Sequence, residues 1–254
     1  MRKLALVRRP GPLLADGIVT HLERTAVDLD LARHQWDGYV AALRREGWQT
    51  IEVPPADSCP DAVFVEDTVV AFRDTAIICR PGHSARRPET SGTESTLRDL
   101  GYRIARIESP HSLDGGDVLK QGDRLYVGIS GRTSRGAMEQ IREHLAGEGA
   151  EVVGVPLSKV LHLKSALTAL PDGTVVAWEE AVDDPAAWEP FVRVAEPHGS
   201  AVVCLDDDTV LMSASAPRSQ EIVAARGLRV VSVDISEFEK LEGCVTCLSV
   251  RLRG

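Results

Sequence analysis

The chain repeats one local pattern, in which an amphipathic helical stretch is followed by a glycine and then by a short run rich in Val and Ile. Glycine after a helix is expected, because it adopts the left-handed conformation that ends many helices at no steric cost. The β-branched run after it predicts a strand. The glycines are Gly47, Gly101, Gly149, Gly199 and Gly227. The first four recur at roughly 50-residue intervals, a period typical of repeat architectures, and the last interval is shorter.

Five such units predict the fold class, which is α/β. Modules of the ββαβ type in one chain would close into a five-bladed α/β propeller around a pseudo-five-fold axis, with strands inside and helices outside. Loops at one end of the axis would converge on a single site. We therefore expect one domain spanning residues 1–254. An ordinary α/β domain, in which helix, glycine and strand also recur, is the alternative.

Individual elements follow from hydrophobic spacing. Apolar residues between Leu29 and Leu43 recur at three- and four-residue steps and predict a helix, and a second helix is expected from about Thr133. Short runs of β-forming residues predict strands at 68–72, 75–79, 124–128 and 174–178.

Composition excludes several classes of function. The formal net charge is −9 and aromatic residues make up 4% of the chain, whereas nucleic-acid binders need basic surfaces and often aromatic platforms. No apolar stretch approaches the roughly 18 residues of a membrane span, and none at the N-terminus is long enough for a signal peptide. We therefore expect a cytoplasmic protein that binds a small molecule, and neither nucleic acid nor membrane. The sequence leaves open whether copies form a homo-oligomer.

Five scattered cysteines are expected to be reduced thiols. Cys244 and Cys247 are close in sequence, which raises the question of a metal or redox pair. Zinc normally takes four ligands, and no second Cys or His pair lies at ligand spacing. A thioredoxin-type pair opens a helix, whereas this one leads into a strand-like run. A nucleophile or an inert thiol is the expected role, and we expect no metal.

Four segments place titratable residues beside apolar strand residues: 60–67, 113–118, 161–165 and 243–249. Glu66, Asp114 and His162 recur at the period of the repeat, so they would face the same end of the axis. Cys247, in the closing segment, would join them. Each segment also has an ordinary structural interpretation, such as a turn around Asp114 or a core histidine at His162.

Taken together, these segments resemble the dimethylarginine dimethylaminohydrolases of the guanidine-modifying pentein superfamily. The resemblance runs from about Leu14 to the C-terminus, and its most specific stretches are 64–67, 80–87, 113–118, 132–133, 161–164 and 246–249. It implies a five-bladed α/β propeller, in agreement with the repeat. It also implies hydrolysis of asymmetric dimethylarginine and monomethylarginine to citrulline and dimethylamine or methylamine, without a cofactor.

The resemblance implies roles for individual residues as well. Cys247 is implied to be the nucleophile, His162 the general acid and base, and Asp114 the catalytic carboxylate. The implied substrate contacts are Glu66 and Asp67 to the guanidinium, Arg86 and Arg132 to the α-carboxylate, Asp61 and the Ile18 backbone to the α-amine, Phe64 to the aliphatic stem, and the Leu241 backbone at the rim.

Two details bear on the fit of the substrate. Adjacent residues on a strand end point to opposite faces, so we expect Asp67 to contact the guanidinium directly and Glu66 to contact it or to support it from behind. Glu242 stands where relatives often carry Asp, and the region around Ile18 is only loosely similar to the family. These departures concern substrate breadth and affinity rather than the chemistry.

The nearest alternatives are other guanidine-modifying enzymes, namely arginine deiminases, amidinotransferases and agmatine deiminases. Arginine deiminases are longer through a helical insertion, and agmatine has no carboxylate for Arg86 and Arg132 to hold. A non-enzymatic five-fold propeller, such as the ribosome anti-association factor, is an alternative of a different class. It would leave the Cys, His and acid residues unexplained.

Overall fold

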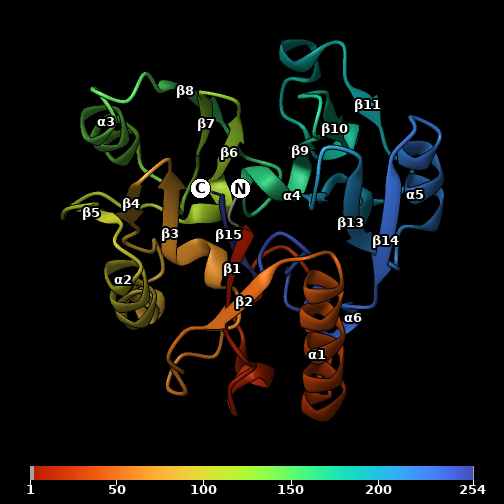
Figure 1. The fold of residues 1–254 in the computed structure, drawn as a ribbon, viewed down its shortest axis with the longest axis horizontal. Helices are drawn as coiled ribbons and strands as arrows, with labels where there is room; N and C mark the ends of the chain where they lie inside the picture. Colours follow the sequence, from red (N-terminus) through yellow and green to blue (C-terminus); the bar gives the residue numbers. More distant parts are fainter. Residues whose placement is uncertain (1–2, 254) are drawn as a thin grey trace.

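Five three-stranded sheets stand around a common axis in the computed structural model, which describes residues 3–253 (Figure 1). In each sheet the first strand is antiparallel to the second, and the second is parallel to the third. Four sheets follow in chain order: β3 (Val69–Phe72), β4 (Thr75–Ile78) and β5 (Arg103–Arg106); β6 (Val118–Gln121), β7 (Arg124–Ile129) and β8 (Glu151–Pro156); β9 (Leu167–Ala169), β10 (Val175–Ala177) and β11 (Val192–Arg193); β12 (Val203–Cys204), β13 (Thr209–Ser213) and β14 (Arg229–Val233). This arrangement confirms the predicted α/β propeller.

The fifth sheet joins the two ends of the described chain. It consists of β15 (Val250–Arg253), β1 (Lys3–Val7) and β2 (Gln49–Glu52), with Lys3 opposite Arg253. The first strands of neighbouring sheets lie against each other nearest the axis, β15 beside β3 and β6 beside β9. The ring is therefore closed by pairing between the first and last strands.

Long helices cover the outside of four modules, each between the second and third strands of its sheet (Figure 1). They are α1 (Leu29–Arg45), α2 (Thr90–Asp99), α3 (Arg135–His144) and α5 (Pro217–Ala224). The predicted helices over Leu29–Leu43 and from about Thr133 correspond to α1 and α3, and the four predicted strand runs correspond to β3, β4, β7 and β10. The module of β9 to β11 instead has two 3₁₀ turns, Glu179–Ala181 and Pro185–Trp188, between β10 and β11.

The predicted helix before Gly199 is wrong. Gly47, Gly101, Gly149 and Gly227 have φ between 74° and 89° and stand between a helix and the third strand of a sheet. Gly199 instead lies in the 3₁₀ turn Pro197–Ser200, before the first strand of its sheet, where a Cβ would overlap the side chain of Ser219. Close packing against Ser219 therefore explains this glycine. The final interval is short because Gly199 precedes the first strand of its sheet, whereas Gly227 precedes the third strand of the same sheet.

Short helical turns precede the innermost strands. The 3₁₀ turns Val65–Thr68 and Gly115–Asp117 lead into β3 and β6, and the one-turn helices α4 (Leu163–Ala166) and α6 (Ser236–Glu239) precede β9 and β15. These turns carry or adjoin most of the predicted site residues. Among residues 3–253, no helix is long and apolar enough to cross a membrane.

Helix α1 fixes the segment before β15. Asp28 caps its first turn by accepting hydrogen bonds from the N–H groups of Asp30 and Leu31. The buried Tyr39 hydroxyl donates to the Val245 carbonyl at 2.9 Å and lies 2.7 Å from the Ser249 hydroxyl. The predicted nucleophile, Cys247, therefore lies in a segment that is anchored on both sides.

Candidate active site

A small pocket lies among the turns that precede the innermost strands. It is lined by Ile18, Asp61, Phe64, Asp67, Arg86, Arg132, Leu161, His162, Leu241, Glu242, Gly243 and Cys247. All the site residues predicted from the sequence line this pocket except Asp114 and Glu66. The structure therefore brings residues from distant parts of the chain to one place, while their individual roles stay predictions.

His162 lies between two carboxylates. Its Nε2 atom is 3.0 Å from Asp114 Oδ2, and its Nδ1 atom is 3.8 Å from Asp67 Oδ1. Burial alone would lower the pKa of His162, but Asp67, Asp114 and Asp117 outweigh it and raise the pKa to about 9. The imidazole is therefore a cation at neutral pH in this structure, ready to donate a proton.

Asp114 is fully buried behind His162 and does not reach the pocket. Its Oδ1 atom accepts the Gly82 N–H at 2.8 Å, and its Oδ2 atom lies 3.4 Å from Arg132 Nη1. The Thr133 hydroxyl lies 3.1 Å from the Asp114 backbone nitrogen. These contacts fix the carboxylate, so Asp114 is placed to orient His162 rather than to touch a bound molecule.

The Asp114–Asp117 turn depends on its glycines. The Gly116 N–H donates to Asp67 Oδ1 at 2.8 Å, and a Cβ at Gly116 would overlap both Asp67 and the His162 ring. Asp117, which the sequence analysis did not assign, accepts the Leu163 N–H at 3.0 Å. Burial raises the pKa of Asp117 to about 6. Asp117 therefore supports the start of α4, directly after His162.

Glu66 and Asp67 point to opposite sides, although the backbone that separates them is a 3₁₀ turn and not the predicted strand end. Asp67 faces the pocket. Glu66 faces a second cavity, where its Oε1 atom lies 2.7 Å from Lys164 Nζ. The Glu66 N–H donates to the Cys247 carbonyl at 3.2 Å. Glu66 therefore contacts the nucleophile segment through its backbone rather than the pocket through its side chain.

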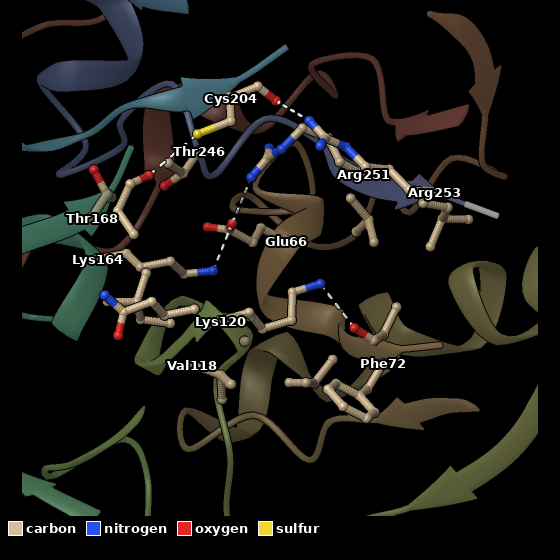
Figure 2. Close-up of a pocket in the computed structure, with 18 of the residues that line it drawn as sticks. Glu66, Phe72, Val118, Lys120, Lys164, Thr168, Cys204, Thr246, Arg251 and Arg253 are labelled. Carbon is tan, nitrogen blue, oxygen red and sulfur yellow. Dashed lines mark hydrogen bonds and ion pairs between the residues drawn. The ribbon is translucent and has the colours of Figure 1, made fainter. Parts of the chain in front are cut away.

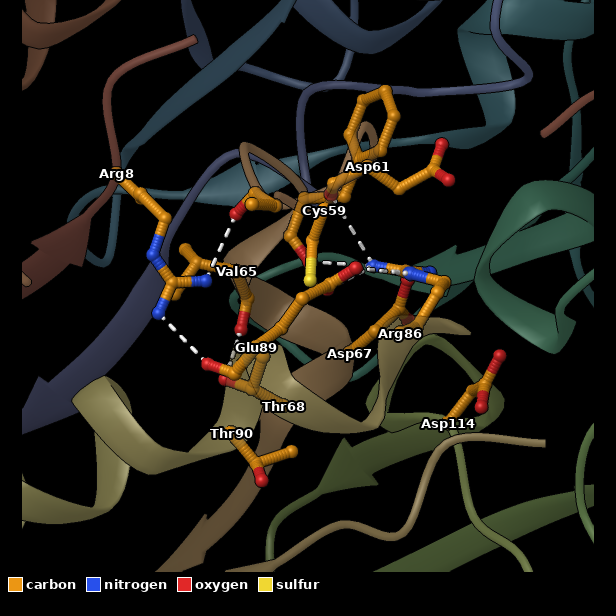
Figure 3. Close-up of polar contacts among 12 residues, drawn as sticks. Arg8, Cys59, Asp61, Val65, Asp67, Thr68, Arg86, Glu89, Thr90 and Asp114 are labelled. Atoms are coloured by element: carbon orange, nitrogen blue, oxygen red, sulfur yellow. Dashed lines mark hydrogen bonds and ion pairs between the residues drawn. The ribbon is translucent and has the colours of Figure 1, made fainter. Parts of the chain in front are cut away.

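Arg86 forms a buried ion network at one wall of the pocket (Figure 3). Its Nη1 atom donates to Asp67 Oδ2 at 2.7 Å, and its Nε and Nη2 atoms donate to Glu89 at 3.0 and 2.9 Å. Burial alone would lower the pKa of Arg86, but Glu89 and Asp67 raise it well above its usual value. Burial alone would raise the pKa of Asp67, but His162 and Arg86 lower it by more. This carboxyl therefore stays ionised.

Glu89 is the main partner that the sequence did not reveal. It is fully buried and its backbone carbonyl accepts a hydrogen bond of 2.8 Å from Arg8 Nη2. Figure 3 shows Glu89 between Arg8 and Arg86. No family stretch contained Glu89, and its only sequence signal was an acid three residues after an arginine.

Cys247 has a second thiol beside it. Its Sγ atom lies 3.2 Å from Cys244 Sγ, and both residues are buried. The contact with Cys244 and burial, together with the nearby carboxylates Glu66 and Asp67, raise the pKa of the Cys247 thiol well above its usual value. Cys247 is therefore protonated at neutral pH in this structure.

The loop around Ile18 is fastened over the pocket. The Ile18 N–H donates to both carboxylate oxygens of Asp61, at 3.1 and 3.2 Å. Glu242, at a left-handed φ of 61°, accepts hydrogen bonds from three successive backbone N–H groups. These belong to Thr20, His21 and Leu22. The two departures from the family pattern, Glu242 and the Ile18 region, are thus in contact with each other.

Comparison with known proteins gives concordant results. The family model described as "N,N dimethylarginine dimethylhydrolase, eukaryotic" matches residues 20–205. The chain is 56% identical to the N(G),N(G)-dimethylarginine dimethylaminohydrolase of Streptomyces coelicolor, over 99% of the chain and 97% of that protein. It is 36% identical to the enzyme of the same name from Pseudomonas aeruginosa, over 99% of the chain and 100% of that protein.

Solved structures agree. The structure matches that of dimethylarginine dimethylaminohydrolase from Pseudomonas aeruginosa complexed with citrulline, with a TM-score of 0.92, 34% identity, and coverage of 99% of this chain and 100% of that chain. The N-terminal domain of ArgZ, a cyanobacterial arginine dihydrolase, is only 20% identical but has a TM-score of 0.89, with coverage of 100% and 98%. The latter likeness shows a shared fold.

Proposed function

Because this chain belongs to the dimethylarginine dimethylaminohydrolase family, we propose that it hydrolyses asymmetric dimethylarginine and monomethylarginine to citrulline and dimethylamine or methylamine. The observation that carries the proposal is the convergence of Cys247, His162 and Asp67 on one pocket. The chain is a hydrolase that acts on an amidine C–N bond. A relative that is similar over its whole length has been solved with citrulline, the expected product.

The substrate's charges match the pocket. The ionised Asp67 holds the guanidinium, while Arg132 and Arg86 hold the α-carboxylate through charge-assisted hydrogen bonds. Asp61 and the Ile18 backbone are close together, as a shared role at the α-amine requires. The remaining contacts are Phe64 along the aliphatic stem and the Leu241 backbone at the rim.

Substrate binding also activates the nucleophile. The Cys247 thiol has a raised pKa, and a guanidinium cation beside it favours the thiolate, so the thiol proton is released to solvent on binding. The thiolate then attacks the central guanidinium carbon and forms a tetrahedral adduct. The His162 imidazolium donates its proton to the departing dimethylamine, and an S-alkylthiouronium remains on Cys247.

Hydrolysis of this intermediate uses His162 in its other protonation state. The neutral imidazole removes a proton from water, and the hydroxide attacks the thiouronium carbon. Collapse of the second adduct expels Cys247 as the thiolate, and loss of the remaining O–H proton leaves the urea of citrulline. Asp114 keeps the ring oriented in both steps and stabilises its cationic form.

We also propose that the protein is a single catalytic domain and that it acts in the cytoplasm. Residues 1–254 form one catalytic domain, as expected if the pocket is assembled from turns of several modules. The protein works in the cytoplasm, since all five cysteines are free and the nucleophile is one of them. The neighbouring activity within the superfamily is arginine deimination, which has the same covalent steps and releases ammonia.

Steady-state kinetics on a substrate panel test the proposal. The panel is arginine, monomethylarginine, asymmetric and symmetric dimethylarginine, and agmatine. Asymmetric dimethylarginine and monomethylarginine should be hydrolysed with similar kcat/KM, roughly 100-fold or more above arginine. Symmetric dimethylarginine should be inert, because a methyl group on each terminal nitrogen places one against Asp67. Arginine as the best substrate, with ammonia as product, would identify a compact arginine deiminase instead.

A further inference from the structure

A second, larger cavity lies behind the turns that carry Asp67 and Cys247. Its volume is about 530 Å³, and the innermost strands line much of it. Lys120 of β6, Lys164 of α4, and Arg251 and Arg253 of β15 extend into it (Figure 2). Cations from three separate modules therefore share one axial space.

The positive charge in this cavity is not balanced by the residues that line it. Of its lining carboxylates among residues 3–253, Glu66 lies beside Lys164 and Arg251, and Asp123 pairs with Arg73 at 3.1 Å. One carboxylate thus faces four cationic side chains, in a chain whose formal net charge is −9. Like charges held around one cavity repel each other unless an anion joins them.

The hydrogen bonds of Lys120 and Arg253 do not compensate the charge of these two side chains. Lys120 Nζ donates to the Ala71 carbonyl at 2.8 Å, and Arg253 Nη2 donates to the Cys204 carbonyl at 2.9 Å. Carbonyl groups orient the donors but carry no net charge. Burial, together with Lys164, Arg251 and Arg253, lowers the pKa of Lys120 to about 8. The cationic neighbours contribute to this shift, in agreement with the single cavity that all four side chains line.

The chemistry of the donors indicates the kind of anion. Guanidinium groups present a planar fork that matches phosphate oxygens, and ammonium groups add compact point charges. The volume lies within the range of small-molecule sites and exceeds that of one phosphate group. We infer that the axial cavity binds a condensed phosphate, held by Lys120, Arg251 and Arg253, with Lys164 at its inner end. This inference does not depend on the proposed hydrolase activity.

Calorimetric titration with inorganic pyrophosphate tests the inference. Ionic strength is held constant with potassium chloride, so that general screening does not change. We expect saturable binding of one pyrophosphate per chain. Lys120→Met and Arg253→Met should each weaken it about 10-fold or more, because each removes a charge-assisted hydrogen bond. Arg193→Met, at an exposed arginine of β11, is the matched control and should bind like the parent protein.

Glu66→Gln provides a test that loss of folding cannot imitate. It removes the carboxylate that competes with the anion for Lys164 and Arg251, so it should tighten pyrophosphate binding. Arg132→Met distinguishes the catalytic pocket from the axial cavity and should leave binding unchanged. No saturable binding, or binding lost in Arg132→Met and kept in Lys120→Met, would overturn the inference. A nucleoside diphosphate titrated in parallel shows whether the site prefers a free or an esterified phosphate.

Discussion

The Sγ atoms of Cys244 and Cys247 lie 3.2 Å apart, so the proposed nucleophile is in contact with a second thiol. Their environments differ beyond that contact. Cys247 lines the pocket, whereas the side chain of Cys244 lies 3.1 Å from the Thr246 hydroxyl. The roles of two thiols in contact can be distinguished only by substituting each cysteine in turn.

Cys247→Ser should abolish turnover, while Cys244→Ser should retain most of it. A hydroxyl at Cys247 is not ionised by the site and cannot form the thiouronium. Citrulline formation from asymmetric dimethylarginine measures both variants, and circular dichroism checks their folding. Equal loss of activity in two folded variants would show that the thiols act as a pair.

The pKa of about 9 for His162 predicts two effects of pH. The ordinary value is 6.5, so the folded state binds this proton more tightly than the unfolded state does. This contribution to stability is fully present below about pH 6.5 and is lost as the pH rises through about 9. The melting temperature should therefore fall over that interval, and amine release should fail at its upper end.

Asp114→Asn tests how much the Asp114 carboxylate contributes to the raised pKa of His162. It keeps the shape of the side chain but removes a charge that raises the pKa of His162. The midpoint of the His162 titration should shift to lower pH, as followed by NMR in a Cys247→Ser background. An unchanged midpoint would show that Asp67 and Asp117 alone hold the proton.

Glu242 should control substrate affinity through the loop around Ile18. Glu242→Gly removes the carboxylate that accepts three backbone N–H groups, yet suits the left-handed backbone at this position. KM should rise about 10-fold or more with a smaller change in kcat. Glu242→Gln keeps the side-chain length, so its KM should lie between those of the parent protein and Glu242→Gly. An unchanged KM in both variants would show that the loop does not contribute to binding.

Substitution of Arg86 should reduce the stability of the fold much more than substitution of Arg132. Arg86→Ala leaves the buried Glu89 without its ion partner and Asp67 with only Gly116 and His162, so it should destabilise the fold by about 3–5 kcal/mol as well as raise KM. Arg132→Ala should raise KM about 10-fold with a small change in melting temperature, because the ion pair between Arg132 and Asp114 is long, at 3.4 Å.

Denaturant unfolding and steady-state kinetics on both arginine variants make the comparison. Glu89→Gln in the Arg86→Ala background should recover part of the lost stability, since it removes the unpaired charge of Glu89. Equal destabilisation by the two arginine substitutions would contradict the assignment of Arg86 to the buried network.

The repeat predicted the ring, whereas most residues of the pocket were implied by the family resemblance. Of the three residues at the repeat period, Glu66, Asp114 and His162, only His162 lines the pocket. Helix, glycine and strand recur where a helix packs on its own sheet, and the same backbone position recurs at one end of the axis. The pattern failed at Gly199, where glycine is required by contact with Ser219 and not by a helix end. Contacts of that kind depend on the folded neighbour and leave no local signal.

The buried partners were harder to predict for the same reason. Glu89 compensates Arg86 from an irregular 3₁₀ turn, Ser84–Glu89, that no hydrophobic period predicts. The directions of Glu66 and Asp67 were expected from a strand, and the 3₁₀ turn separates them too. The cavity that Glu66 enters could not be predicted, because its lining comes from strands of different modules.

The pairing of β15 with β1 couples folding to catalytic competence. Contacts between residues so far apart in sequence cost more loop-closure entropy than local contacts do. Cys247 lies three residues before β15, so the pairing of β15 with β1 helps to hold it beside His162 and Asp67. A chain in which every other module has folded is still an incomplete enzyme. The strand pairing that closes the ring therefore also holds the nucleophile in place.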